Sequence, residues 1–202
     1  MTARFLALGD SYSIGEAVAE GHRWPVQLAH ALRAQGVDLA DPTIVAQTGW
    51  TTDELSAGIT QAGVTGPYDL VTLLIGVNNQ YRGRSLDEYD VEFRALLDRA
   101  LLFAGHRPSH VIVLSIPDWG VTPFAEGRDR AQVAAEIDAF NAVNHARARE
   151  AGCHYVDVTP VSRQAATDSS LVASDGLHPS GAMYAQWAAL VLPVAQAILQ
   201  HA

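Results

Sequence analysis

Short apolar runs alternate along this chain with longer segments in which apolar residues recur every three or four positions. The runs at 4–8, 43–46, 69–75, 110–116 and 155–158 predict five strands. Residues 70–75 are almost continuously apolar, which is typical of a central parallel strand covered on both faces.

The segments between these runs have the periodicity and the end signals of helices. Helices are predicted over 24–35, from 51 onward, and over 85–104, 130–151 and 180–199. Gly36 ends the first of them. The pairs Thr51–Glu54 and Ser85–Glu88 have the spacing of capping boxes, which mark helix N-termini.

Five strands that alternate with helices predict a three-layer α/β/α sandwich around a five-stranded parallel sheet with right-handed crossovers. No repeat, low-complexity tract or linker interrupts the 202 residues, so we expect one domain over 1–202. In such a sheet, functional side chains belong at the carboxyl ends of the strands.

Composition narrows the possible partners. The net charge of −9, without a local run of Lys or Arg, argues against nucleic acid and anionic membrane surfaces. The one cysteine, Cys153, excludes an intramolecular disulfide and a Cys-based zinc site, and its position favours a small hydrophobe over a reactive thiol. We find no apolar stretch of the roughly 18 residues that span a membrane and no signal peptide. We therefore expect a cytoplasmic protein without stable membrane insertion, whose oligomeric state stays open.

Candidate chemistry gathers where the predicted strands end. The segments Gly9-Asp10-Ser11, Gly49 and Gly76-Val77-Asn78 follow the first three strands, and Asp175-Gly176-Leu177-His178-Pro179 precedes the last helix. A serine, a histidine and a carboxylate are the groups that turn a hydroxyl into a nucleophile. Each residue alone is better explained as a helix cap or a turn, but their common placement favours catalysis.

These four blocks resemble the SGNH (GDSL-like) hydrolase family, in the family's order and over nearly the whole chain. The resemblance implies a flavodoxin-like SGNH fold and a serine esterase that forms an acyl-enzyme intermediate without metal or cofactor. It implies Ser11 as the nucleophile, His178 as the base and Asp175 as the carboxylate that orients His178. It also implies an oxyanion hole formed by the N–H groups of Ser11 and Gly49 and the side-chain amide of Asn78.

Two features near these blocks need their own interpretation. Asn79 stands where the family's third block commonly has an aspartate, and we expect this change to alter loop packing rather than chemistry. Asp10 is a tempting second carboxylate, and we expect it to hold its loop by hydrogen bonds. The other histidines lack the spacing of metal ligands.

The substrate is predicted less sharply than the mechanism. Four aromatic residues are expected near the site, either to contact substrate or to pack the loops: Trp50, Tyr81, Trp119 and Phe124. Arg82 and Arg84 either contact an anionic group of the substrate or are solvated. Without a long lid, we expect a shallow cleft for a small-molecule ester with a short acyl group, for example an O-acetyl ester. The alternatives are a lysophospholipase or thioesterase of the same family, and a noncatalytic ligand-binding domain with the same fold.

Overall fold

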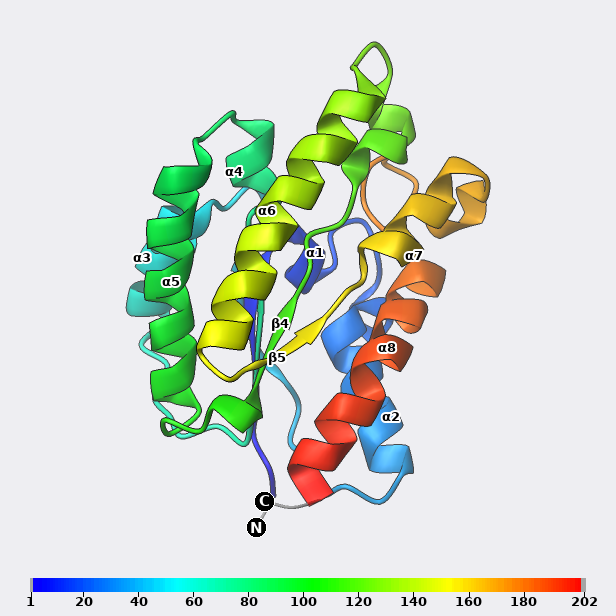
Figure 1. Ribbon diagram of the computed structural model, residues 1–202. Helices are drawn as coiled ribbons and strands as arrows, with labels where there is room; N and C mark the ends of the chain where they lie inside the picture. The colour runs from blue at the N-terminus through cyan, green and yellow to red at the C-terminus, as the bar shows by residue number, and fades with distance from the viewer. Residues whose placement is uncertain (1, 201–202) are drawn as a thin grey trace.

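A parallel sheet forms the centre of the computed structural model, which describes residues 2–200. Its strand order is β2-β1-β3-β4-β5, and every adjacent pair is parallel (Figure 1). The strands are β1 (Phe5–Asp10), β2 (Thr43–Gln47), β3 (Leu70–Leu74), β4 (Val111–Leu114) and β5 (His154–Val156). This order is that of flavodoxin-like folds.

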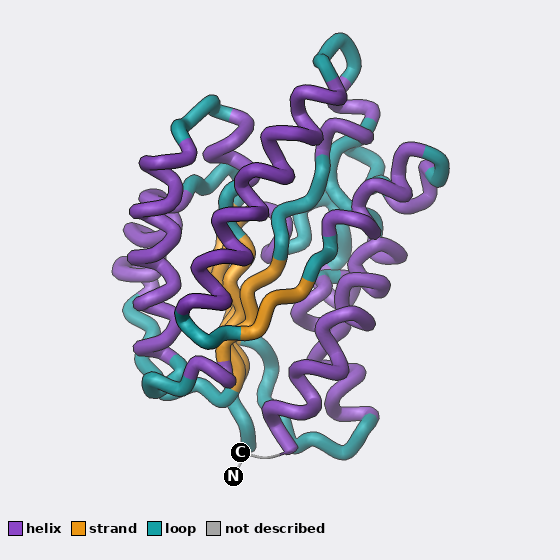
Figure 2. Tube along the Cα trace, in the orientation of Figure 1, coloured by secondary structure: helices purple, strands orange, loops and turns teal. Residues whose placement is uncertain are grey.

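Helices cover both faces of the sheet, so the predicted three-layer architecture is confirmed (Figure 2). One face carries α2 (Trp24–Ala34) and α8 (Gly181–Gln200), which pack against each other. The other face carries α3 (Thr52–Ala62), α5 (Leu86–Phe103) and α6 (Arg130–Glu150).

Burial follows from this layering. All residues of β1, β3 and β4 are buried, whereas the edge strands β2 and β5 are partly exposed. The predicted strand positions are confirmed with small shifts at their ends. The shift that matters most for the site is at β1. This strand continues past Leu8 to Asp10, so the next residue, Ser11, begins a helix directly.

Several short helices at the sheet edge and in the loops were not predicted. The α-helical ones are α1 (Ser11–Ile14), α4 (Val77–Tyr81) and α7 (Thr159–Arg163). The 3₁₀ turns span Glu20–His22, Pro108–His110, Trp119–Val121, Pro123–Ala125, Gln164–Ala166 and Ser169–Leu171. Segments of three to five residues are too short to show a helical period in the sequence.

The two predicted capping boxes have different outcomes. At α3 the box is complete, because the Thr51 N–H donates to Glu54 Oε2 at 2.9 Å and the Thr51 side chain accepts from the Glu54 N–H. At α5 the Ser85 side chain accepts from the Glu88 N–H at 3.2 Å, without the reciprocal bond.

Helix α8 corrects the expectation about apolar stretches. It is 20 residues long with a mean hydropathy of 1.5, long and apolar enough to cross a membrane by those criteria alone. Tyr184, Trp187 and Val191 of α8 are fully buried, and the helix packs against α2. Its apolar composition is therefore accounted for by its place in a layer of the fold.

The register of the sheet brings the candidate segments together. Gly9 of β1 pairs with Ala46 of β2 on one side and with Leu74 of β3 on the other. Because these strands are parallel and end at the same level, the loops that follow them lie along one edge of the sheet.

Candidate active site

Ser11 is placed by an abrupt turn from β1 into α1. The Asp10 carboxylate accepts the Tyr12 N–H at 3.0 Å and so caps α1. A Cβ atom on Gly9 would lie 2.1 Å from Ser13 Oγ and 2.5 Å from the Leu74 carbonyl oxygen. Only glycine therefore allows α1 to fold back so closely onto the strand end, which explains the glycine two residues before Ser11.

Asp175 holds both the backbone and the ring of His178. Its Oδ1 accepts the N–H groups of Leu177 and His178, each at 3.0 Å, and its Oδ2 lies 2.6 Å from His178 Nδ1. Burial acts to raise the pKa of Asp175, but these three hydrogen bonds outweigh it and lower that pKa. An ionised carboxylate only accepts, so Nδ1 carries the proton and Nε2 is left as the basic nitrogen.

Ser11 and His178 come together at one cleft of about 110 Å³, although 167 positions separate them in the sequence. Gly49 and Asn78 line the same cleft. Both Ser11 and His178 are buried, at 3% and 7% exposure. No hydrogen bond joins these two described side chains, and such bonds are often long before substrate binds. The structure thus assembles the predicted set, and the roles of its members stay predictions.

The two predicted oxyanion donors other than Ser11 come from neighbouring loops. Gly49 has φ = +84°, a conformation that suits glycine. Asn78, in α4, donates through Nδ2 to the Trp50 carbonyl at 3.0 Å and to Asp10 Oδ2 at 3.3 Å. In this state both N–H bonds of the amide have protein acceptors, and the longer one is directed at Asp10.

Asp10 holds its surroundings by hydrogen bonds, as expected, and it is completely buried. Burial raises the pKa of its carboxyl to about 7, against the opposing hydrogen bonds from the Tyr12 N–H and the Asn78 amide. The carboxyl therefore changes its charge close to neutral pH, directly behind Ser11 and Asn78.

Asn79, the residue at the family's aspartate position, packs loops together. It is fully buried, its Oδ1 accepts the Thr52 N–H at 3.1 Å, and its Nδ2 donates to Thr52 Oγ1 at 2.7 Å. Thr52 is the first residue of α3. Asn79 thereby joins α4 to the start of α3 and does not line the cleft.

Three of the four predicted aromatic residues border the cleft and contact one another. The ring centroids of Tyr81 and Trp119 are 5.3 Å apart, those of Trp119 and Phe124 are 5.9 Å apart, and those of Tyr81 and Phe124 are 6.0 Å apart. We call these three residues the aromatic cluster. Trp50 lies elsewhere, because its ring packs against Gly58 of α3.

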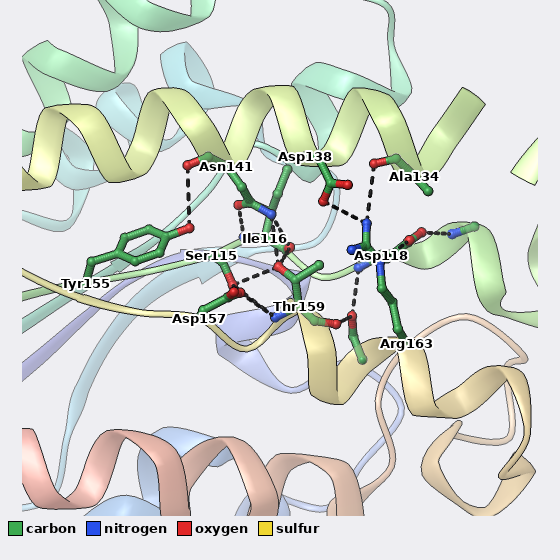
Figure 3. Close-up of polar contacts among 12 residues, drawn as sticks. Ser115, Ile116, Asp118, Ala134, Asp138, Asn141, Tyr155, Asp157, Thr159 and Arg163 are labelled. Carbon is green, nitrogen blue, oxygen red and sulfur yellow. Dashed lines mark hydrogen bonds and ion pairs between the residues drawn. The ribbon is translucent and has the colours of Figure 1, made fainter. Parts of the chain in front are cut away.

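The segment before Trp119 is held in place by a polar network that includes Ile116 and Asp118 (Figure 3). Asp118 Oδ2 accepts Arg163 Nε at 2.9 Å, and the Asp118 N–H donates to Ser162 Oγ at 2.9 Å. Asn141 of α6 pairs with both the N–H and the carbonyl of Ile116. The segment after β4 is thus tied to both α6 and α7, a connection that no local motif in the sequence indicates.

Arg82 and Arg84 are engaged with the protein rather than free for an anionic substrate. Arg84 forms ion pairs with three carboxylates, those of Asp53, Glu88 and Glu92. Arg82 donates to the Gly49 carbonyl at 2.6 Å and pairs with Glu54 at 3.2 Å. Except for the pair Arg84–Glu88, which are four residues apart, these contacts join residues distant in the sequence, so neither sequence interpretation anticipated them.

Other reactive groups contribute little. Within residues 2–200, no group of three or more His, Cys, Asp or Glu side chains could hold a metal ion, and His201 lies outside the described residues. Burial raises the pKa of the Cys153 thiol to about 11, which favours the unreactive protonated form.

Comparison with known proteins agrees with the motifs. The model of the GDSL-like Lipase/Acylhydrolase family matches residues 7–186. No curated protein matches the chain.

Solved structures of similar fold cover almost the whole chain at low sequence identity. TesA has a TM-score of 0.75 at 20% identity, over 97% of this chain and 99% of its own. An acetyl xylan esterase from Geobacillus stearothermophilus, the W215I variant of Axe2, has a TM-score of 0.73 at 20% identity, over 96% and 97%. A lipase/acylhydrolase from Enterococcus faecalis has a TM-score of 0.71 at 19% identity, over 98% and 97%. These similarities show the fold.

Proposed function

The chain belongs to the GDSL-like lipase/acylhydrolase family and is a carboxylic ester hydrolase, and on this premise we propose that it works through a Ser11–His178–Asp175 triad. One observation carries the proposal. Ser11 and the imidazole that Asp175 orients border the same cleft as Gly49 and Asn78. A nucleophile, a base with a defined tautomer and hydrogen-bond donors are the parts that acyl transfer requires.

The reaction then proceeds in two halves. Ser11 Oγ bonds to the carbonyl carbon of the ester while His178 Nε2 takes the hydroxyl proton. The tetrahedral intermediate collapses, the bond to the alcohol oxygen breaks, and His178 returns the proton to that oxygen. Water attacks the acyl-Ser11 ester with His178 again as the base, and release of the carboxylic acid restores Ser11.

The oxyanion of both tetrahedral intermediates needs donors that are already oriented. We assign this role to the N–H groups of Ser11 and Gly49 and to Asn78 Nδ2. Asn78 can exchange its longer contact, 3.3 Å to Asp10, for the oxyanion while it keeps the 3.0 Å contact to Trp50. Loss of one such donor typically lowers turnover by roughly 10²–10³.

The cleft suits a short acyl group and an alcohol with a flat apolar face. The space that a water-sized sphere can occupy in it is about 110 Å³, well below the roughly 300–1,000 Å³ of sites for larger small molecules. Tyr81 and Phe124 of the aromatic cluster are 44% and 47% exposed, so their rings are available to a bound alcohol. An acetyl xylan esterase is among the proteins of similar fold. We therefore propose O-acetyl esters, with acetylated sugars as the class to test first. Lysophospholipase and thioesterase activity of the same machinery are the alternatives to be tested.

The test is hydrolysis of p-nitrophenyl esters from acetate to palmitate by the wild type, Ser11→Ala and Ser13→Ala. Ser13 is the matched control, because it lies in α1 but does not line the cleft. We expect the highest kcat/KM on the acetate, loss of activity and of fluorophosphonate labelling in Ser11→Ala, and near wild-type rates in Ser13→Ala. Equal rates for Ser11→Ala and wild type would refute the triad. A steady rise toward long chains would refute the short acyl group.

A further inference from the structure

The loop that carries Gly49 is held at three consecutive residues by side chains from two helices. Arg82 Nη2 donates to the Gly49 carbonyl at 2.6 Å. Asn78 Nδ2 donates to the Trp50 carbonyl at 3.0 Å, and Glu54 Oε2 accepts the Thr51 N–H at 2.9 Å. Two of these three anchors, Asn78 and Arg82, come from α4 and the residue that follows it.

Gly49 is the member of this loop whose N–H remains available. No hydrogen bond runs from the Gly49 N–H to another residue in 2–200, and Gly49 lines the cleft beside Ser11 and Asn78. The N–H belongs to the Thr48–Gly49 peptide and the carbonyl to the Gly49–Trp50 peptide. Because glycine has wide conformational freedom at φ and ψ, the first can reorient unless the second is held. The Gly49–Trp50 peptide on its far side is held by two hydrogen bonds. Arg82 donates to the Gly49 carbonyl at 2.6 Å, and the Trp50 N–H donates to the Gln47 carbonyl at 3.3 Å, so the Arg82 contact is the shorter one.

We propose that Arg82 is a positioning residue that holds Gly49 so that its N–H faces the oxyanion. The inference rests on the proposed function, because it takes Gly49 to be an oxyanion donor. Because Asn78 lies in α4 and Arg82 directly follows this helix, one short segment then sets two of the three donors. Donors that are oriented before the reaction need no reorganisation when charge develops.

A purely structural role for Arg82 predicts that its replacement lowers stability rather than kcat. Its ion pair with Glu54 is exposed on both sides, at 43% and 41% of the side chains, so its loss should change stability little. Arg84 is the matched control. It follows the same helix, pairs with Asp53, Glu88 and Glu92, and makes no contact with Gly49.

The experiment measures kcat and KM on p-nitrophenyl acetate for wild type, Arg82→Met, Arg82→Lys and Arg84→Met. Thermal unfolding and the ¹⁵N–¹H resonance of Gly49 are recorded for each variant. We expect Arg82→Met to lower kcat about tenfold or more, with KM within about twofold, since deletion of a whole donor costs roughly 10²–10³. Arg82→Lys keeps a charged donor and should recover part of kcat. Arg84→Met should stay within about twofold of wild type and should leave the Gly49 resonance in place.

Three results would overturn the inference. They are a kcat for Arg82→Met within twofold of wild type, an equal loss in Arg84→Met, or a rise in KM alone, which would assign Arg82 to substrate binding. If Arg82→Met is unstable, Arg82→Lys tests the proposal in its place. A kcat of Arg82→Lys as low as that of Ser11→Ala, together with an unchanged Gly49 resonance, would also contradict the proposal. Failure of the proposed function is recognised separately, by wild-type activity in Ser11→Ala.

Discussion

Asp175 and His178 are three residues apart, yet one carboxylate binds both the backbone N–H of His178, at 3.0 Å, and its ring nitrogen Nδ1, at 2.6 Å. Both groups come from a single turn, so these hydrogen bonds form within it. The Tyr12 ring of α1 also packs against the imidazole, with 5.2 Å between the ring centroids. The Leu177 N–H, from the same turn, donates to Asp175 Oδ1 together with the His178 N–H. The carboxylate is thereby held ionised and fixed relative to the ring.

Replacement of Asp175 by asparagine keeps the size of this side chain and removes its charge, so it tests whether the charge is needed for activity. The amide oxygen can still accept the backbone N–H groups, but an NH₂ group facing Nδ1 favours the wrong tautomer of His178. We expect kcat on p-nitrophenyl acetate to fall by at least about 10²-fold with little change in fold. Asp168→Asn is the control, because Asp168 caps an exposed turn in the same way. Equal activities of the two variants would contradict the triad.

The buried carboxyl of Asp10 should make stability depend on pH. Its pKa is raised from 3.8 to about 7, so the folded state binds its proton more tightly than the unfolded state does. Stability from this group is therefore full below about pH 4 and is lost as the pH rises toward 7. Three pKa units correspond to a loss on the order of 4 kcal/mol.

We expect Asp10→Asn to remove this slope in the free energy of unfolding, measured with urea at pH 5, 6, 7 and 8. Lowered pKa values such as that of Asp175 act in the opposite sense and in a more acidic range, so they do not hide the effect. The exposed Asp168→Asn variant should keep the wild-type slope. A wild-type slope in Asp10→Asn would show that another group is responsible.

Gly9→Ala should damage both stability and the placement of Ser11. The added methyl group would meet Ser13 Oγ at 2.1 Å and the Leu74 carbonyl oxygen at 2.5 Å, and the strand backbone cannot yield cheaply. We expect the free energy of unfolding to fall by about 1–3 kcal/mol or more, together with a loss of activity. Gly21→Ala is a matched control, because a Cβ there has no neighbour within 4 Å. Equal urea midpoints for the two variants would refute this packing argument.

Tyr81→Ala should weaken substrate binding without loss of the catalytic machinery. The ring is 44% exposed at the cleft and contacts Trp119 and Phe124. Loss of one aromatic contact worth about 1 kcal/mol should raise KM on acetylated oligosaccharides about fivefold, with kcat nearly unchanged. Leu102→Ala, an exposed apolar side chain on α5 outside the cleft, should leave KM unchanged. An unaltered KM in Tyr81→Ala would remove the aromatic cluster from the alcohol site.

The alternation of apolar and polar segments was enough to predict the sheet, its layers and the edge where the candidate residues gather. This succeeded because each strand is buried on one or both faces, which leaves a direct mark on the sequence. The Asp175–His178 pair could also be predicted, since its geometry is contained in one turn. The extension of β1 to Asp10 and the short helices α1 and α4 could not be predicted, because segments of so few residues show no period in the sequence.

Long-range contacts decided the rest. Trp50 and Trp119 both follow predicted strands in the sequence. Packing places the Trp50 ring against Gly58 and leaves Trp119 at the cleft. From the sequence, Arg82 is either a contact to an anionic group of the substrate or a solvated charge, and only the approach of the loops after β2 and β3 places the Gly49 carbonyl within its reach. Residue types and local spacing thus specify which chemistry the chain can perform. Apart from the Asp175–His178 pair, whose hydrogen bonds form within one turn, the orientation of these groups depends on side chains from distant elements, which come together only after the chain has folded.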